Sequence, residues 1–231
     1  MDLANKRQTV TLLLVWAALL AAAWFASPAF MRSALRLSAS LPHRAVTSEL
    51  SVDDRAATRV EINDLRKKIF SKKQQGDTSV TDDALELAIR YEKLGAYWKA
   101  KQSLSHILKR ESANAQAWMH LSRIFEGLTL YSDAAEAWRT TIELDPKNPS
   151  NYARLAYVLD RRFNDSFSAN GVYVEGLVRS GNTPELMRSY ALFLERIGEK
   201  NAALLYWRAL FEKEPQDTSI QDRIRDLENT M

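Results

Sequence analysis

Residues 115–148 read AQAWMHLSRIFEGLTLYSDAAEAWRTTIELDPKN, and the fold follows from this stretch. Trp118, Leu121 and Phe125 stand at positions i, i+3 and i+7, which places them on one face of an α-helix. Further along, an alanine followed four positions later by a tryptophan marks a second helix that can cross the first closely. Pro146 ends that helix, because proline cannot continue one. The stretch therefore predicts two helices joined by a short turn.

The same pattern recurs at intervals of about 34 residues. Four units align, 81–114, 115–148, 149–183 and 184–217, and the third carries one extra residue in or near 163–168. The aligned columns are Ala84, Trp118, Tyr152 and Met187; Leu87, Leu121, Leu155 and Tyr190; Ala88, Ser122, Ala156 and Ala191; Tyr91, Phe125, Leu159 and Leu194; Ala100, Ala134, Ala169 and Ala203; and Leu104, Trp138, Tyr173 and Trp207. No unit can bury its apolar stripe alone, so the units are expected to stack.

Other segments carry helix signals at their ends. Ser51 precedes two acidic residues, which is typical of a capped helix start, and Thr183 precedes a proline in the first helical position. Residues 218–231 place Ile220, Ile224 and Leu227 on one face. They predict a C-terminal amphipathic helix that covers the exposed end of the last unit.

The repeated residues resemble the tetratricopeptide repeat (TPR) family, whose unit is a helix–turn–helix of about 34 residues with this alternation of small and large positions. The resemblance covers residues 81–217. It implies an all-α fold: a right-handed α-solenoid of four TPR helix pairs, followed by the capping helix. TPR domains resemble one another in acting as binding surfaces, so the resemblance implies an interaction protein and not an enzyme.

In the TPR family the first helices of the pairs line an inner groove that holds a peptide or a partner helix. The family's groove positions correspond here to Leu85, Ile89, Met119, Arg123, Ala153, Tyr157, Arg188 and Leu192, and neighbouring turns add His120, Arg154, Asp160, Arg161 and Arg196. Arginine pairs with carboxylates in a bidentate way, which favours a protein or peptide ligand with an acidic segment or a free C-terminal carboxylate. The alternative is that these arginines pair with Glu92, Glu126, Asp160 and Glu195 and only solvate the helices.

The N-terminal segment predicts a membrane anchor. No charged residue occurs from Gln8 to Met31. At about 1.5 Å per residue, a helix over this stretch covers about 36 Å, enough for a hydrocarbon core of ~30 Å. Residues 1–31 are therefore interpreted as a tail and a transmembrane helix that acts as a signal anchor. The alternative is a cleavable signal peptide, with Lys6-Arg7 as its basic region and Ser27-Pro28-Ala29 as its cleavage site.

Residues 32–80 are interpreted as a linker and a basic stalk helix. Residues 1–73 hold 12 Lys or Arg against 6 Asp or Glu, whereas residues 74–231 hold 20 against 23. Within the stalk, Val60, Ile62, Leu65 and Ile69 form a narrow apolar stripe. The stalk is either an exposed helix whose basic end complements its dipole, or a helix that touches anionic lipid or packs on a partner helix.

Several classes of function are disfavoured by what the sequence lacks. Cysteine is absent, which excludes disulfides and thiolate chemistry, and the three histidines have no metal-ligand spacing. Catalytic signatures and phosphate-binding loops are not found, and no cofactor is predicted. The aromatic residues fall in the core columns of the repeat, so they do not predict a nucleic-acid surface.

The order of segments (one transmembrane helix, a basic stalk, four TPR units) is similar to the TPR subunit of bacterial cytochrome c haem lyases. The prediction is a non-catalytic membrane-anchored adaptor that binds a polypeptide in its groove during assembly of an exported protein or envelope complex, cytochrome c maturation among them. Cationic residues flank the apolar segment almost equally, and the short N-terminal tail favours a single-pass inner-membrane protein with a periplasmic TPR domain. The alternative is a permanent structural subunit of a large membrane complex for polysaccharide export, pili or secretion.

Overall fold

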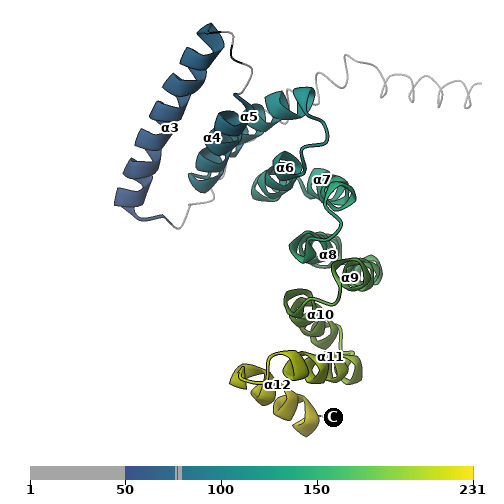
Figure 1. Cartoon of the computed structure of the whole chain (residues 1–231). Coiled ribbons are helices and arrows are strands. Elements are labelled where there is room, and N and C mark those ends of the chain that lie inside the picture. Colours follow the sequence, from purple (N-terminus) through teal and green to yellow (C-terminus); the bar gives the residue numbers. More distant parts are fainter. Residues whose placement is uncertain (1–49, 76, 78–79, 231) are drawn as a thin grey trace, which may run out of the picture. The chain divides into compact units, whose positions relative to one another are not determined.

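The computed structural model describes residues 50–75, 77 and 80–230, and the regular elements of this part of the chain are all α-helices (Figure 1). In chain order they are α3 (Val52–Gln74), α4 (Thr81–Lys93), α5 (Tyr97–Arg110), α6 (Ala115–Gly127), α7 (Tyr131–Leu144), α8 (Pro149–Phe163), α9 (Ser166–Ser180), α10 (Pro184–Arg196), α11 (Lys200–Lys213) and α12 (Thr218–Asn229). The expectation of an all-α chain is confirmed for these residues.

Helices α4 to α11 form four consecutive pairs. The first helices begin at residues 81, 115, 149 and 184, and the second helices at 97, 131, 166 and 200. The spacing is constant in each series except for one step that is a single residue longer, so the extra residue of the third unit lies between residues 149 and 166. Helix α8 absorbs it, with 15 residues where α4, α6 and α10 have 13.

The turn inside each pair contains one residue in the left-handed conformation. Gly95, Thr129, Asn164 and Gly198 have φ of 71°, 60°, 55° and 87°. In the first, second and fourth pairs the next amide donates to a carbonyl five residues back, at 2.8–2.9 Å. In the third pair Asp165 donates to the carbonyl of Leu159, six residues back. The left-handed residue closes the first helix and redirects the chain toward the second.

The predicted helix starts are confirmed in part. The backbone N–H of Asp54 donates to Ser51 Oγ at 3.1 Å, so Ser51 caps α3 as expected. Pro184 occupies the first turn of α10, but the Thr183 side chain makes no capping hydrogen bond. Its hydroxyl is buried without a partner in the described part of the chain, so the expected threonine cap is wrong.

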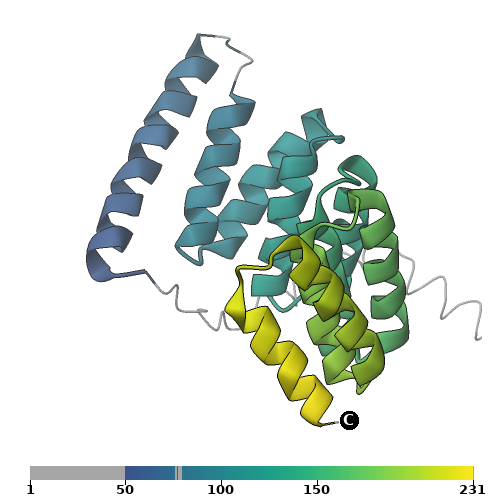
Figure 2. The ribbon, with the colours of Figure 1, turned by 60° about the horizontal axis from the view of Figure 1, so that its bottom comes forward.

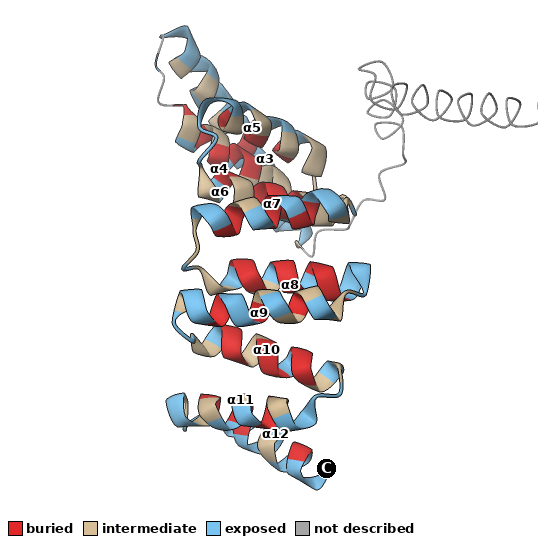
Figure 3. Ribbon diagram, turned by 90° about the vertical axis from the view of Figure 1, so that its right-hand side faces the viewer, coloured by how far each residue is buried: buried red, intermediate tan, exposed pale blue. Residues whose placement is uncertain are grey.

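The apolar core of the described residues falls into two clusters. Eight buried residues of α4, α5 and α6 form the N-terminal cluster, and twenty-three buried residues of α7 to α12 form the C-terminal cluster (red in Figure 3). Between them, Ser122 Oγ lies 3.5 Å from Thr141 Oγ1, and Trp138 Nε1 donates to Glu126 at 2.8 Å. Trp138, Tyr152, Tyr173 and Trp207 are buried, which confirms the interpretation of these aromatic residues as core. Trp118, the fifth residue of that set, is only half-buried against the N-terminal cluster.

Helix α3 lies alongside α4 in both ribbon views (Figures 1 and 2) and contacts it largely through charge. Lys68 and Lys72 approach the buried carboxylate of Asp83 at 2.6 and 2.7 Å. Only Thr58 and Ile62 of α3 are buried. Val60 is 60% exposed, so the predicted apolar stripe is narrower than the sequence indicated. The stalk helix therefore packs on the first TPR-like pair of its own chain.

Helix α12 covers the other end of the stack. Ile220 is fully buried and Leu227 nearly so, both within the C-terminal cluster. Arg208 of α11 also binds Glu228 at 2.7 Å.

Among the described helices, none combines the length and the apolar character needed to cross a membrane. The span predicted at residues 8–31 lies outside the described residues and stays a prediction.

Candidate functional site

The first helices α6, α8 and α10 lie on one side of the stack and the second helices α7, α9 and α11 on the other (Figure 1). We use the term first-helix face for the solvent-accessible side chains of α4, α6, α8 and α10. We use the term second-helix face for those of α5, α7, α9 and α11. The residues predicted to bind a partner all belong to first helices, but they differ in accessibility.

The apolar members of the predicted set are less available than the sequence indicated. Leu85 is buried in the N-terminal cluster, because α5 and α6 both pack against its side of α4. Ile89, Met119 and Ala153 are half-buried against the two clusters. By contrast, Tyr157 is 41% exposed and Leu192 is 46% exposed on the first-helix face.

Each first helix carries an acidic residue in its last turn: Glu92, Glu126, Asp160 and Glu195 occupy equivalent positions of the four units. Three of these carboxylates bind a cationic or imidazole group of the next first-position helix. Glu92 contacts both His120 (2.7 Å) and Arg123 (2.8 Å) of α6, Asp160 contacts Arg196 of α10, and Glu195 contacts Arg223 of α12 (2.8 Å). The acidic column thus ties each unit to its successor at three of the four junctions.

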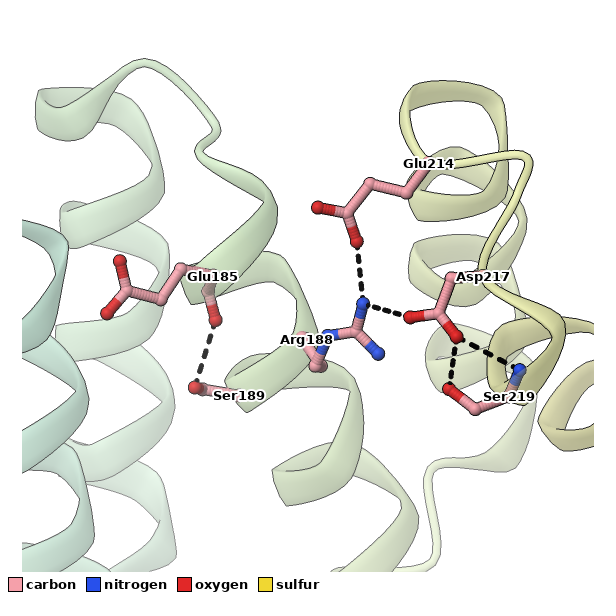
Figure 4. A network of polar contacts seen from close by, with 6 residues as sticks. All are labelled: Glu185, Arg188, Ser189, Glu214, Asp217 and Ser219. Carbon is pink, nitrogen blue, oxygen red and sulfur yellow. Dashed lines mark hydrogen bonds and ion pairs between the residues drawn. The ribbon is translucent and has the colours of Figure 1, made fainter.

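Arg188 is paired in a different way (Figure 4). Its guanidinium donates to Glu214 at 2.6 Å and to Asp217 at 2.8 Å, two residues that lead into α12. Asp217 also accepts hydrogen bonds from the hydroxyl and the amide of Ser219. The Ser219 hydroxyl and Arg188 hold the pKa of the Asp217 carboxyl below its usual range. Arg188 therefore fixes the segment that leads into the capping helix α12.

The five predicted arginines consequently divide into two groups. Arg123, Arg188 and Arg196 form ion pairs, as the alternative interpretation requires. Arg154 and Arg161 of α8 are exposed and form no ion pair with any described residue. His120 is buried against Glu92 and is not a groove residue.

The junction between α6 and α8 is the one without a tie between units. Its acidic residue, Glu126, accepts a hydrogen bond from Trp138 of its own unit. Arg154 stands at the position equivalent to His120 and Arg223, yet it makes no ion pair with Glu126. A repeated contact is thus absent at a single place in the described stack, and both partners remain accessible there.

A surface pocket of about 420 Å³ opens at this junction. It is lined by Glu92, Tyr97, Arg123, Glu126, Gly127, Thr129, Tyr131, Arg154, Tyr157 and Arg162. The Arg162 guanidinium lies over the Tyr131 ring, 4.8 Å from its centroid, with the Tyr157 ring at 5.9 Å. Burial raises the pKa of Tyr97 above its ordinary value, so its hydroxyl stays neutral at physiological pH, as that of an ordinary tyrosine does.

Five lining residues were missed in the sequence, namely Tyr97, Gly127, Thr129, Tyr131 and Arg162. Tyr97 and Tyr131 stand at equivalent positions in the first turns of α5 and α7, and this pair of aligned tyrosines was the available signal. Arg162 follows Arg161 on α8 and was passed over because it does not align with a family groove position. No group of three or more potential ligand side chains in the described ranges is placed to hold a metal ion.

Comparison with solved structures identifies the architecture. MamA matches 74% of this chain and 98% of its own, at 20% identity and a TM-score of 0.57. A tetratricopeptide repeat protein from Parabacteroides merdae matches 73% of this chain and 72% of its own, at 12% identity and a TM-score of 0.55. This chain has the TPR fold.

YrrB, described as a TPR protein with an unusual peptide-binding site, shares the TPR fold as well. It matches 65% of this chain and 77% of its own, at 16% identity and a TM-score of 0.51. No protein-family model matches the sequence, and no curated protein does.

Proposed function

We propose that this chain is a non-catalytic, membrane-anchored TPR adaptor that holds a polypeptide partner against its first-helix face. The observation that carries the proposal is the pocket at the α6–α8 junction. There Arg154 forms no ion pair with a described residue, Arg162 is held over aromatic rings, and Tyr157 is exposed. Arg161 adds a second guanidinium on the same helix that has no ion pair within the described part of the chain.

The ligand that fits this arrangement is an acidic segment or the free C-terminal carboxylate of a protein. A guanidinium presents parallel N–H donors that match the two oxygens of a carboxylate, and tyrosine rings supply apolar contact area with a polar tip. Arg123 is partly neutralised by Glu92, so Arg154 and Arg162 are the principal cations of the pocket. YrrB offers a precedent, since its TPR fold is described with a peptide-binding site.

The proposal is tested by crosslinking from the pocket. A photoreactive amino acid replaces Tyr157 in the full-length protein in cells, and the control carries it at Leu205, which is exposed on the second-helix face. The proposal predicts a polypeptide adduct from position 157 that is lost in the variant Arg154→Gln/Arg162→Gln, which removes the two principal cations of the pocket. The matched variant Arg139→Gln/Lys147→Gln removes the same charge and should retain the adduct. Absence of any adduct at position 157 would refute the proposal.

We further propose an inner-membrane location with the TPR domain in the periplasm, and a role in assembling exported proteins such as c-type cytochromes. Support comes from the apolar segment at residues 8–31 and from the order of the segments. Because the chain contains no cysteine, Ser219→Cys creates a unique thiol on exposed α12. Labelling of intact cells by a membrane-impermeant maleimide is the expected result. Labelling only after lysis would assign the domain to the cytoplasm and exclude the cytochrome role.

A second candidate function, a permanent subunit of a large membrane complex, is favoured by the second-helix face of the third and fourth units. Phe167, Val174 and Val178 of α9 are 91%, 45% and 77% exposed, and Leu205 of α11 is 66% exposed. The positions of α7 equivalent to the first three are Ser132, Arg139 and Glu143. Detergent extraction separates the candidates: a stable stoichiometric complex supports the subunit, and a monomer that captures a polypeptide only transiently supports the adaptor.

A further inference from the structure

The last turns of α3 and the end of α5 bring unpaired cations together around an apolar hollow. Residues 66–73 read RKKIFSKK, with five basic residues and no acidic one. Lys68 and Lys72 are used in the contact with Asp83, and Lys67 lies 3.5 Å from Asp64 on the same helix. Arg66 and Lys73 make no ion pair with any described residue. Lys109 and Arg110, at the end of α5, likewise form none within the described ranges.

These cations border two adjoining pockets. One, of about 360 Å³, is lined by Lys73, Lys109 and Arg110 together with Ile69, Ala84, Leu87 and Ile107, among other residues of α3, α4 and α5. The other is lined by Arg66, Lys67, Phe70 and Lys73, and shares Ile69 and Leu87 with the first. We use the term basic patch for Arg66, Lys67, Phe70, Lys73, Lys109 and Arg110.

Two properties of the basic patch point to its ligand. Like charges from separate helices repel one another, and no described carboxylate forms an ion pair with Arg66, Lys73, Lys109 or Arg110. Phe70 lines the same pocket as Arg66 and Lys73, and 64% of its surface is exposed to solvent. An aromatic ring is stabilised when it leaves water for an apolar environment. An anionic surface with an apolar interior would satisfy both properties at once, since cations bind its headgroups and the ring enters its acyl boundary.

Chain connectivity favours a bilayer over a soluble acidic partner. The apolar segment ends at residue 31 and α3 begins at Val52, so residues 32–51 join them. Such a tether spans at most about 70 Å when fully extended and usually far less. Residues 32–49 carry three arginines and one glutamate, so this linker is itself basic and does not complement the patch.

We infer that the basic patch docks on the anionic lipid headgroups of the membrane that holds the N-terminal segment, with Phe70 at the acyl boundary. The inference rests on the membrane anchor of the proposed function. It adds that the TPR stack is held against the bilayer at its α3–α4 end, and that the first-helix pocket at the α6–α8 junction remains free for a polypeptide.

The test uses the full-length chain reconstituted into vesicles of phosphatidylcholine, alone or with phosphatidylglycerol. The Phe70→Cys variant carries an environment-sensitive fluorophore, and the Phe167→Cys variant, labelled on the second-helix face, is the matched control. The expected result is a blue shift and quenching by lipid-chain quenchers at position 70 in the anionic vesicles only, reversed by high salt. No such change is expected at position 167.

A variant with three of the cations removed measures how much the charge of the basic patch contributes to membrane binding. Each Lys or Arg near an anionic surface contributes about fivefold to binding, so Lys73→Gln/Lys109→Gln/Arg110→Gln should weaken docking of the probe about 100-fold. The variant Arg139→Gln/Lys147→Gln/Lys213→Gln makes the same change in net charge and should dock normally. Equal responses in both kinds of vesicle, or equal loss in both charge variants, would overturn the inference. So would a probe that responds to an added acidic peptide and not to anionic lipid.

A separate assay tests the membrane anchor itself, so that a failure of the anchor can be distinguished from a failure of the basic patch to dock. Alkaline carbonate extraction of the same vesicles reports whether the N-terminal segment is integral, independently of the probe at residue 70. Crosslinking from position 157 reports partner capture, and the charge variant of the basic patch should leave that adduct unchanged.

Discussion

The two ends of the described stack are covered by helices attached in different ways. Helix α12 inserts Ile220 and Leu227 into the C-terminal cluster of twenty-three buried residues. Helix α3 buries only Thr58 and Ile62, and otherwise relies on lysine contacts with Asp83 and an arginine contact with Glu61. Salt screens ion pairs between exposed groups such as Arg90 and Glu61, and screens the lysine contacts of the buried Asp83 carboxylate less, whereas apolar burial does not depend on such screening. The C-terminal end is thus expected to be fixed and the N-terminal end separable.

The largest expected effect is at the C-terminal end. Ile220→Ala removes a fully buried side chain from the C-terminal cluster and should lower the free energy of unfolding by about 2–5 kcal/mol. Chemical denaturation measures this change. Ile62→Ala, the counterpart in α3, should instead reduce hydrogen-exchange protection in α3 alone. Equal global losses in the two variants would contradict the difference between the ends.

Packing in the two core clusters can be compared at two glycines. A Cβ on Gly176 would lie 2.6 Å from Cγ and 2.7 Å from Cβ of Tyr152, atoms near the backbone that cannot move away. Gly176→Ala is therefore expected to destabilise the protein by about 1–3 kcal/mol. A Cβ on Gly127 would meet only the far end of the Tyr97 ring, which can rotate, so Gly127→Ala should cost less. Thermal denaturation of both variants checks the order.

The attachment of α3 is expected to depend on pH. Hydrogen bonds and charge from Lys68 and Lys72 hold the pKa of Asp83 below its ordinary value of about 4. A carboxyl whose pKa is lower in the folded state stabilises that state above its unfolded pKa, and this contribution is lost as the pH falls through the folded value. The hydrogen-exchange protection factors of α3, which correct for the intrinsic pH dependence of amide exchange, should therefore fall below about pH 4. Asp83→Asn should show the low protection of α3 already at neutral pH, with α7 to α12 unchanged.

The smallest effect is expected at Gly171 of α9. No atom lies within 4 Å of the position where its Cβ would be, so an added methyl group meets open space. Gly171→Ala should raise stability by about 0.5–1 kcal/mol, because alanine loses less backbone entropy in a helix. A melting temperature above that of the unsubstituted protein is the expected result. A decrease would contradict the argument that the added methyl group meets open space.

The repeat could be read from the sequence because its signal is local and periodic. Columns such as those of Tyr152 and Trp207 recur once in every unit, and each unit meets its neighbours through the same positions. The extra residue of the third unit was also found in this way. The missing threonine cap at residue 183 could not be found, because a side-chain rotamer decides it.

The candidate site was predicted less well, because ion pairs between residues of different units decide which of its arginines are available to a partner. Arg123 and Arg154 look alike in the sequence, but only the first reaches a carboxylate of the preceding unit. The sequence of α4 alone does not show that α5 and α6 pack on Leu85, so this residue was predicted to be accessible to a partner. The aligned acidic residues from Glu92 to Glu195 were visible, yet their partners lie about one unit further along the chain.

The turn at Asn164 indicates where this chain can accept inserted residues. The extra residue of the third unit lengthens α8 ahead of this turn, and the hydrogen bond that closes the helix reaches one position further back. The helix that follows still begins one full unit before α11, so the change is not passed on. A place that has already tolerated an insertion is the natural site for a further one. An epitope tag inserted between Asn164 and Asp165 would lengthen the protein and leave its inter-helix contacts in register.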